Sequence, residues 1–168
     1  MDKDIETRID GFTIRFGEEK DAGIIYNLVK ELAEYEKLLD SLEVTEELLK
    51  ETLFHRGVVE AIIGEYKHKP VAYAIFFHTF SSFTGRIGIF IEDLYVKPQM
   101  RRKGLGEIMF SFIAKLAMER KCGRLEWSCL DWNKPSIAFY KKMEAEALDE
   151  WTTYRLDGRK LEKVAGEF

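Results

Sequence analysis

Apolar residues recur at every third or fourth position in several stretches of the chain, a spacing typical of amphipathic helices. The clearest stretch covers residues 105–117 and predicts a helix of about three turns that ends near residues 122–123. A first helix is predicted after Asp21, and a short one from Pro135 to Met143. These helical patterns are separated by stretches with a different spacing.

The segment 37–54 is acidic and predicts one more helix, which we interpret as a lid or side helix. Thr45 is a residue type that caps helix N-termini, because its hydroxyl can accept a hydrogen bond from an unpaired backbone N–H. Leu48, Leu49 and Leu53 follow it and are expected to face inward.

β-branched and aromatic runs with strand character lie between and after these helices. Polar breaks at 67–70 and 81–85 separate three of these runs and indicate hairpin turns. The predicted strands cover residues 12–16, 58–66, 71–80, 86–96, 124–130 and 151–156.

The order strand 86–96, helix 105–117, strand 124–130 predicts a right-handed crossover between parallel strands. Together with the hairpins, it indicates an α/β fold with a mixed sheet. We therefore expect a central, twisted, mostly antiparallel sheet with one parallel βαβ crossover and flanking helices.

Composition narrows the class of protein. The chain has 168 residues, 46% of them hydrophobic, which predicts one domain. Its net charge is only -4 although 33% of its residues are charged, so we expect neither a nucleic-acid nor a membrane partner. The start of the chain lacks signal-peptide features and no apolar run is long enough to span a membrane, which predicts a cytoplasmic protein.

The few cysteines and histidines do not predict a disulfide framework or a metal site. Cys122 and Cys129 lack any ligand spacing and are interpreted as reduced, buried small residues. The three histidines show no ligand spacing either, so no metal cofactor is expected.

A basic, glycine-containing loop follows the strand 86–96. Arg101, Arg102 and Lys103 precede Gly104 and Gly106 at the predicted start of the helix 105–117. Unpaired backbone N–H groups and the helix dipole converge there, which suits a phosphate or pyrophosphate. The alternative is a solvated basic turn. The loop lacks the Ser or Thr of a P-loop and the third glycine of a dinucleotide motif, which disfavours nucleoside triphosphates and NAD.

These residues resemble the GNAT superfamily of N-acetyltransferases, whose acetyl-CoA motif is matched by Arg101-x-x-Gly104-x-Gly106. Residues 92–96 upstream and 131–142 downstream look like the accompanying motifs of that family. The segment 30–36 and the Glu92-Asp93 pair are similar to the spermidine/spermine and thialysine acetyltransferase branch. The resemblance covers nearly the whole chain and implies one acetyltransferase domain over residues 1–168.

The resemblance implies that acetyl-CoA is the co-substrate. Backbone groups of Leu94 and Val96 would hold the acetyl and pantetheine arm beside a bulged strand, and N–H groups of residues 102–107 would cradle the pyrophosphate. Asn133 and Ser136 would contact the co-substrate from the far side. The full implied set is Leu94, Tyr95, Val96, Arg101, Arg102, Lys103, Gly104, Leu105, Gly106, Glu107, Asn133, Lys134, Pro135 and Ser136.

Two residues are predicted to move protons. A carboxylate in an apolar strand tends to have a raised pKa, as a general base needs. Strand alternation would point Glu92 and Asp93 to opposite faces, and similarity favours Glu92 as the base, acting through water. The alternative is an edge strand with solvated or paired acids. Similarity also favours Tyr140 as the acid that protonates the departing thiolate; the alternative is a core aromatic residue.

The acceptor is expected to be a small primary amine. Carboxylates and aromatic faces attract ammonium groups, and the candidate lining residues are Tyr35, Glu36, Glu92 and Trp127. Residues 81–83 are Ser-Ser-Phe where polyamine enzymes of the branch carry an acid and a tryptophan, which disfavours long polyamines.

Further expectations come from the same resemblance. Glu144 replaces the glycine that usually ends the tyrosine helix, which predicts a different C-cap. The resemblance also implies a homodimer. Two functions are alternatives to a small-molecule acetyltransferase. One is an enzyme that acetylates a protein N-terminus or lysine, and the other is a non-catalytic acyl-CoA-binding domain.

Overall fold

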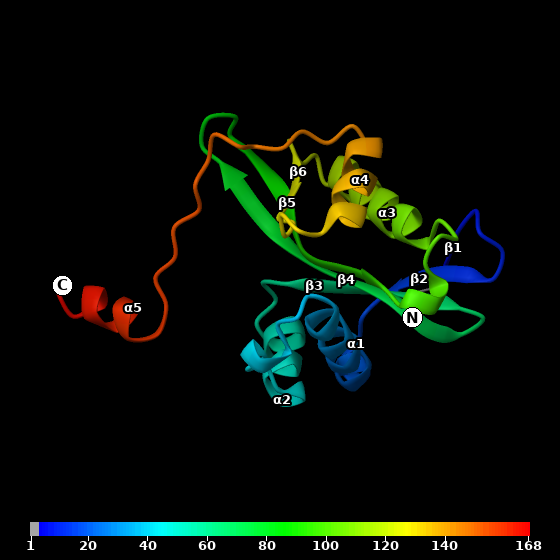
Figure 1. The fold of residues 1–168 in the computed structure, drawn as a ribbon, viewed down its shortest axis with the longest axis horizontal. Helices are drawn as coiled ribbons and strands as arrows, with labels where there is room; N and C mark the ends of the chain where they lie inside the picture. The colour runs from blue at the N-terminus through cyan, green and yellow to red at the C-terminus, as the bar shows by residue number, and fades with distance from the viewer. Residues whose placement is uncertain (1–3) are drawn as a thin grey trace. The chain divides into compact units, whose positions relative to one another are not determined.

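A computed structural model describes residues 4–168, which form two compact units, residues 4–128 and residues 129–168 (Figure 1). The first unit holds the whole sheet and the helices α1 (Ala22–Tyr35), α2 (Glu46–Lys50) and α3 (Leu105–Glu119). The second holds α4 (Lys134–Lys142) and α5 (Gly158–Ala165). The prediction of a single domain stays a prediction.

Within residues 4–168, the sheet has six strands in the spatial order β1-β2-β3-β4-β5-β6. Every neighbouring pair is antiparallel except β5 and β6, which are parallel and joined through α3. The predicted mixed, mostly antiparallel sheet is confirmed. The strands are β1 (Ile5–Glu6), β2 (Phe12–Phe16), β3 (Glu60–Tyr66), β4 (Lys69–Ser81), β5 (Arg86–Val96) and β6 (Leu125–Trp127).

In the first unit, α1 and α2 cover one face of the sheet and α3 covers the other (Figure 1). The helices are α1 (Ala22–Tyr35), α2 (Glu46–Lys50, continued by a π turn over Glu51–His55) and α3 (Leu105–Glu119). Short 3-10 turns cover Glu19–Asp21, Leu39–Ser41 and Pro98–Met100. The second unit holds α4 (Lys134–Lys142) and α5 (Gly158–Ala165).

The start of α1 is held by an ion pair that links it to β2. The Asp21 carboxylate accepts the backbone N–H of Glu18 at 2.8 Å and the Arg15 guanidinium at 2.6 and 3.0 Å. Arg15 also donates to Glu65 of β3 at 2.9 Å. The side chains of Arg15 and Asp21 are 16% and 3% exposed, so this charged pair lies inside the unit.

The α1 face of the sheet carries a continuous core. Tyr73 of β4 and Tyr95 of β5 are paired in register and pack with Ile25 and Leu28 of α1. Leu49 and Leu53, four residues apart on one side of α2 and its π turn, complete this layer. α1 is therefore fixed against the middle of β4 and the C-terminal end of β5.

Local turn and cap predictions are confirmed. Lys67 and His68 adopt φ of 51° and 60° between β3 and β4, the two left-handed residues that a tight hairpin turn requires. Thr45 caps α2 by accepting the Leu48 N–H at 3.1 Å.

Three predictions about secondary structure and burial are wrong. Residues 151–156 form no strand in the described part of the second unit, because β propensity produces a strand only where a partner strand completes its hydrogen bonds. α5 follows them instead, unpredicted. Leu48 is 51% exposed, since only Leu49 and Leu53 share the inward side of their helix. The predicted strand 124–130 is limited to β6, whose pairing stops at Trp127.

Candidate functional site

A β-bulge interrupts β5 at Glu92. Ile91 pairs with Phe76 of β4 and Asp93 pairs with Ile75, so Glu92 has no partner residue on β4. An extra residue of this kind bends a strand and breaks the regular alternation of its side chains. The bulged strand expected from the resemblance is therefore present.

The bulge decides which face receives Asp93. Residues paired across antiparallel strands share a face, so Asp93 lies on the face of Ile75, where α1 packs. Without the extra residue, Asp93 would share the face of Ile91. The bulge therefore interrupts the regular alternation between Ile91 and Asp93. Glu92 is exposed to solvent and Asp93 is half-buried.

Beyond the bulge, the side of β5 that faces away from β4 has no partner strand among residues 4–168, and we call it the open side. The parallel pairing with β6 ends at Ile91 and Trp127. The Lys97 N–H donates to Val71 of β4 at 2.9 Å, and by strand alternation the N–H groups of Leu94 and Val96 point away from β4. These donors match the backbone groups expected to hold a thioester arm.

The loop after β5 leads into α3 through left-handed backbone. Arg102 has φ of 60°, and Gly104, the N-cap of α3, has φ of 79°, a conformation that favours glycine. The first N–H groups of α3 have no acceptor within the helix. A Cβ added at Gly106 would lie 3.7 Å from Val96, so the backbone is accessible where the helix start meets the open side of β5. A pyrophosphate fits this arrangement.

The three cations of the loop, Arg101, Arg102 and Lys103, differ in their surroundings. The Arg101 guanidinium lies 4.4 Å from the centre of the Tyr35 ring and 5.5 Å from that of Tyr95, and its Nε donates to the Val96 carbonyl at 2.9 Å. Arg101 therefore ties the loop to α1 and β5. Arg102 and Lys103 remain exposed and can meet an anion.

An acidic cluster gathers beside the bulge from three elements. We use this name for Glu36 at the end of α1, Tyr73 of β4, and Glu92 and Asp93 of β5. The Tyr73 hydroxyl donates to Asp93 Oδ2 at 2.9 Å. Burial raises the pKa of Asp93 to about 6, the charges of Glu92 and Glu36 add to this rise, and the Tyr73 hydrogen bond opposes it. Burial also raises the pKa of Glu36.

Such a cluster has two chemical capacities. Several carboxylates that face one region attract an ammonium group. A carboxyl whose pKa lies near neutrality can also accept a proton and release it again. The sequence left open the alternative that both acids are solvated. Glu92 is exposed and agrees with this alternative, whereas Asp93 is half-buried and hydrogen-bonded to Tyr73. Tyr73 was not predicted; the signal for it was a tyrosine inside a buried strand, whose hydroxyl needs a partner.

The structure brings together only some of the residues predicted to bind the amine. Glu36 and Glu92 belong to the acidic cluster, and the Tyr35 ring lies under Arg101. The Trp127 ring instead packs edge-on against Phe110 of α3, with 5.0 Å between ring centres. Trp127 therefore lies on the α3 side of the sheet, away from Glu36 on the α1 side.

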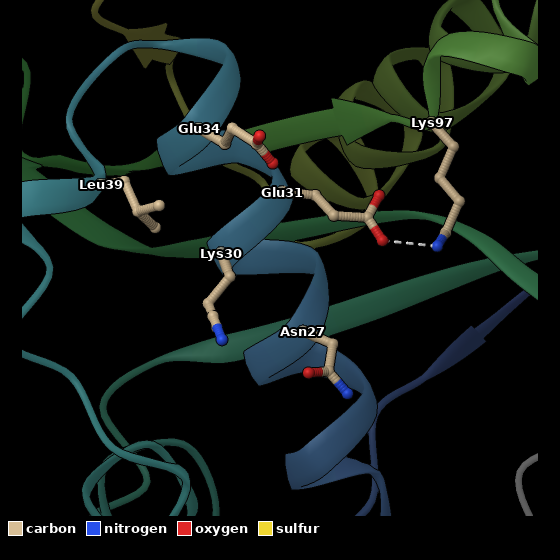
Figure 2. A pocket seen from close by; sticks show the side chains of 6 residues that line it. All are labelled: Asn27, Lys30, Glu31, Glu34, Leu39 and Lys97. Atoms are coloured by element: carbon tan, nitrogen blue, oxygen red, sulfur yellow. Dashed lines mark hydrogen bonds and ion pairs between the residues drawn. The ribbon is translucent and has the colours of Figure 1, made fainter.

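A polar groove lies beside α1, next to the end of β5. Its volume is about 460 Å³, and Figure 2 shows Lys97 reaching toward Glu31 across it. The two side chains form an ion pair at 2.6 Å, and the Tyr95 hydroxyl donates to Glu31 at 3.3 Å. These contacts hold β5 to the helix that carries Tyr35 and Glu36. The groove is lined by Asn27, Lys30, Glu31, Glu34, Leu39 and Lys97.

The second unit contains the remaining predicted residues. Asn133 caps α4 by accepting the Ser136 N–H at 3.3 Å, and Pro135 lies in the first turn of that helix. Lys134 donates to the Asp131 carbonyl at 2.8 Å. Tyr140 lies in α4, and its ring centre is 5.3 Å from that of Phe139.

The end of α4 corrects one prediction. Glu144 adopts φ of 59°, the left-handed conformation that a glycine would take there. The Ala145 N–H donates to the Tyr140 carbonyl at 3.1 Å and the Glu144 N–H donates to Lys141 at 3.0 Å, as in a glycine-type cap. The expected change of cap is therefore wrong, because these hydrogen bonds hold a non-glycine residue in this conformation.

Among residues 4–168, no group of three or more acidic, histidine or cysteine side chains is arranged to hold a metal ion. Over the same residues, no helix combines the length and the apolar character needed to cross a membrane.

Known proteins are similar to this chain in sequence and in fold. Residues 24–144 match the Acetyltransferase (GNAT) family. The chain is 36% identical over 166 residues to a thialysine N-epsilon-acetyltransferase of Bos taurus, covering 92% of this chain and 97% of that protein. A Caenorhabditis elegans enzyme of the same name is 36% identical over 148 residues, 85% of this chain and 90% of that protein.

A solved structure shares the fold at low sequence identity. It is an integron cassette protein of V. cholerae with a TM-score of 0.78 and 22% identity, covering 92% of this chain and 98% of that one. The family match and the high coverage of the relatives agree with the open strand, the glycine loop and the acidic cluster. The chain therefore belongs to the GNAT acetyltransferase family and is an N-acetyltransferase.

Proposed function

We propose that this enzyme transfers the acetyl group of acetyl-CoA to the terminal amine of a small, lysine-like molecule by direct attack in a ternary complex. The observation that carries the proposal is the acidic cluster at the bulge, next to the open side of β5. The relatives named thialysine N-epsilon-acetyltransferase support an amino-acid side chain as the acceptor.

Acetyl-CoA supplies the acetyl group as a thioester. Backbone N–H groups of Leu94 and Val96 hold the thioester arm and stabilise the negative charge that develops on its oxygen. The helix start around Gly104 and Gly106, with Arg102 and Lys103, binds the pyrophosphate. Asn133 and Ser136 are proposed to contact the co-substrate as well.

The acceptor amine must lose a proton before it attacks, since a lysine-type ammonium has a pKa near ~10.4. Carboxylates of β5 take this proton, and exposed Glu92 relays it through water to solvent. Glu36 attracts the ammonium group, with Tyr35 beside it. Tyr140 is proposed to protonate the departing thiolate.

Release of CoA thiol in the presence of a panel of amines tests the function. We expect turnover with thialysine, lysine or ornithine and weaker turnover with spermine, because residues 81–83 lack an acid. Acetylation of peptides alone would favour a protein acetyltransferase. Tight acetyl-CoA binding without turnover for any amine would indicate a non-catalytic acyl-CoA-binding domain.

Gly106→Glu is expected to weaken acetyl-CoA binding at least tenfold while the fold persists. The new side chain has room in the protein but fills the space proposed for the pyrophosphate and adds negative charge there. A glutamate in the first turn of α3 is favourable to the helix, so stability should not fall. Isothermal titration calorimetry measures the affinity.

Ser111→Glu is the matched control for this change. Ser111 is an exposed residue further along α3, so the same charge is added to the same helix away from the loop. If Gly106→Glu left the affinity for acetyl-CoA unchanged, the pyrophosphate would not bind at this loop.

A homodimer in the cytoplasm completes the proposal, and the dimer is supported by the resemblance alone. Light scattering after size exclusion should give twice the mass of one chain. A monomer that is active toward amines would contradict the dimer and leave the reaction in place.

A further inference from the structure

One tyrosine hydroxyl inside the sheet is not used by the proposed reaction. Tyr73 is 0% exposed, and its hydroxyl donates to Asp93 Oδ2 at 2.9 Å. Burial, followed by the charge and the hydrogen bond of Asp93, raises the pKa of Tyr73 well above 10, so its phenol stays protonated and is the donor of this bond. The bond therefore fixes one oxygen of Asp93 and leaves Oδ1 to face another group.

The bulge creates this contact. Tyr73 pairs with Tyr95, and Ile75 pairs with Asp93, so all of these residues share the α1 face. In a regular strand Asp93 would lie on the opposite face, out of reach of Tyr73. The extra residue Glu92 thus has a specific result, which is to bring a carboxylate to a buried phenol.

The charged and titratable groups around Asp93 come from each element packed against it. Glu36 at the end of α1 and the neighbouring Glu92 both oppose its ionisation, and Tyr73 of β4 supports it. Among residues 4–168, no lysine or arginine forms an ion pair with Asp93, and none contributes to the shift of its pKa. An arriving ammonium would supply the missing positive charge.

We propose that Asp93 Oδ1 accepts the proton from the acceptor ammonium, that Tyr73 is the residue that positions Asp93, and that Glu92 relays the proton onward. This inference rests on the proposed function and assigns its first step. An N–H bond of the ammonium breaks, its proton moves to Oδ1, and the electron pair left on nitrogen attacks the thioester carbon. The carboxyl then passes the proton through water to exposed Glu92.

The pH profile of Tyr73→Phe tests the positioning role. The wild-type enzyme should lose kcat/KM as the pH falls through about 6, where Asp93 becomes protonated. Because the hydroxyl stabilises the ionised form, its removal should move this acid limb upward by about one pH unit. Rates above the new limb should recover toward the wild-type value.

Tyr26→Phe is the matched control. Tyr26 is a partly buried tyrosine of α1 packed on the same core, and within residues 4–168 no hydrogen bond joins its hydroxyl to the acidic cluster. This variant should keep the wild-type limb. A limb that stays in place in Tyr73→Phe would overturn the positioning role and leave Tyr73 as a structural residue.

Two isosteric variants test the first acceptor. Asp93→Asn should lower kcat/KM by about 10²- to 10⁴-fold and abolish the acid limb. Glu92→Gln should cause a smaller loss and retain the limb. The reverse pattern would return the first step to Glu92 and overturn the proposal. Absence of wild-type turnover with every amine would instead overturn the proposed function, so the two failures are distinguishable.

Discussion

Arg15→Met is expected to lower the free energy of unfolding by about 3–5 kcal/mol. The variant removes the guanidinium that hydrogen-bonds to Asp21 at 2.6 and 3.0 Å and leaves a carboxylate that is only 3% exposed. A buried charge without its partner is far more costly than the same charge in water. Urea denaturation followed by circular dichroism measures the change.

Arg124→Met is the control for this prediction. Arg124 pairs with Glu126 at 2.8 Å, but its side chain is 43% exposed, and exposed pairs contribute about 0–1 kcal/mol. Equal losses in the two variants would show that burial of the Arg15 pair does not matter.

The loss in Arg15→Met should also depend on pH. Burial disfavours ionised Asp21, but the Arg15 and Glu18 hydrogen bonds outweigh burial and hold its pKa below the usual 3.8. A lowered carboxyl pKa stabilises the fold above the unfolded value, and this stabilisation disappears as the pH falls through the folded value. The gap between wild type and Arg15→Met should therefore narrow below pH 3.8. If the difference in unfolding free energy between the two proteins increased at low pH, the Arg15–Asp21 pair would not be its cause.

Tyr140→Phe is expected to reduce kcat by about 10²-fold or more while acetyl-CoA affinity stays unchanged. The variant keeps the ring and its contact with Phe139 and removes only the hydroxyl proposed to protonate the leaving thiolate. Pre-steady-state release of CoA thiol, with calorimetry for affinity, separates the chemical step from binding.

Tyr154→Phe controls for loss of a tyrosine hydroxyl in the same unit. Tyr154 is 91% exposed and lies outside the proposed site, so its variant should retain full turnover. Undiminished turnover in Tyr140→Phe would assign Tyr140 to packing, the alternative that the sequence left open.

Much of the fold follows from local patterns. The helical period predicted α1 and α3, and β2 and β5 were predicted with the bounds that they have in the structure. These elements bury a continuous apolar face, so packing agrees with local preference. The strand predicted at 151–156 failed because a strand also needs a partner, and a single stretch of sequence does not specify one.

The candidate site was likewise predictable from the sequence only in part. The basic glycine loop was predictable, since Gly104 and the start of α3 are neighbours in sequence. The inward turn of Arg101 was not, because it depends on the rings of Tyr35 and Tyr95, which come from other elements.

The sequence by itself determined most of the elements, the basic glycine loop and the family. Only the tertiary structure decided which acid lies inside, because that depends on how β4 and β5 are aligned. One unpaired residue, Glu92, moves Asp93 to the face of Tyr73. No local propensity records this shift, since side-chain direction after a bulge is set by hydrogen bonds to a distant strand.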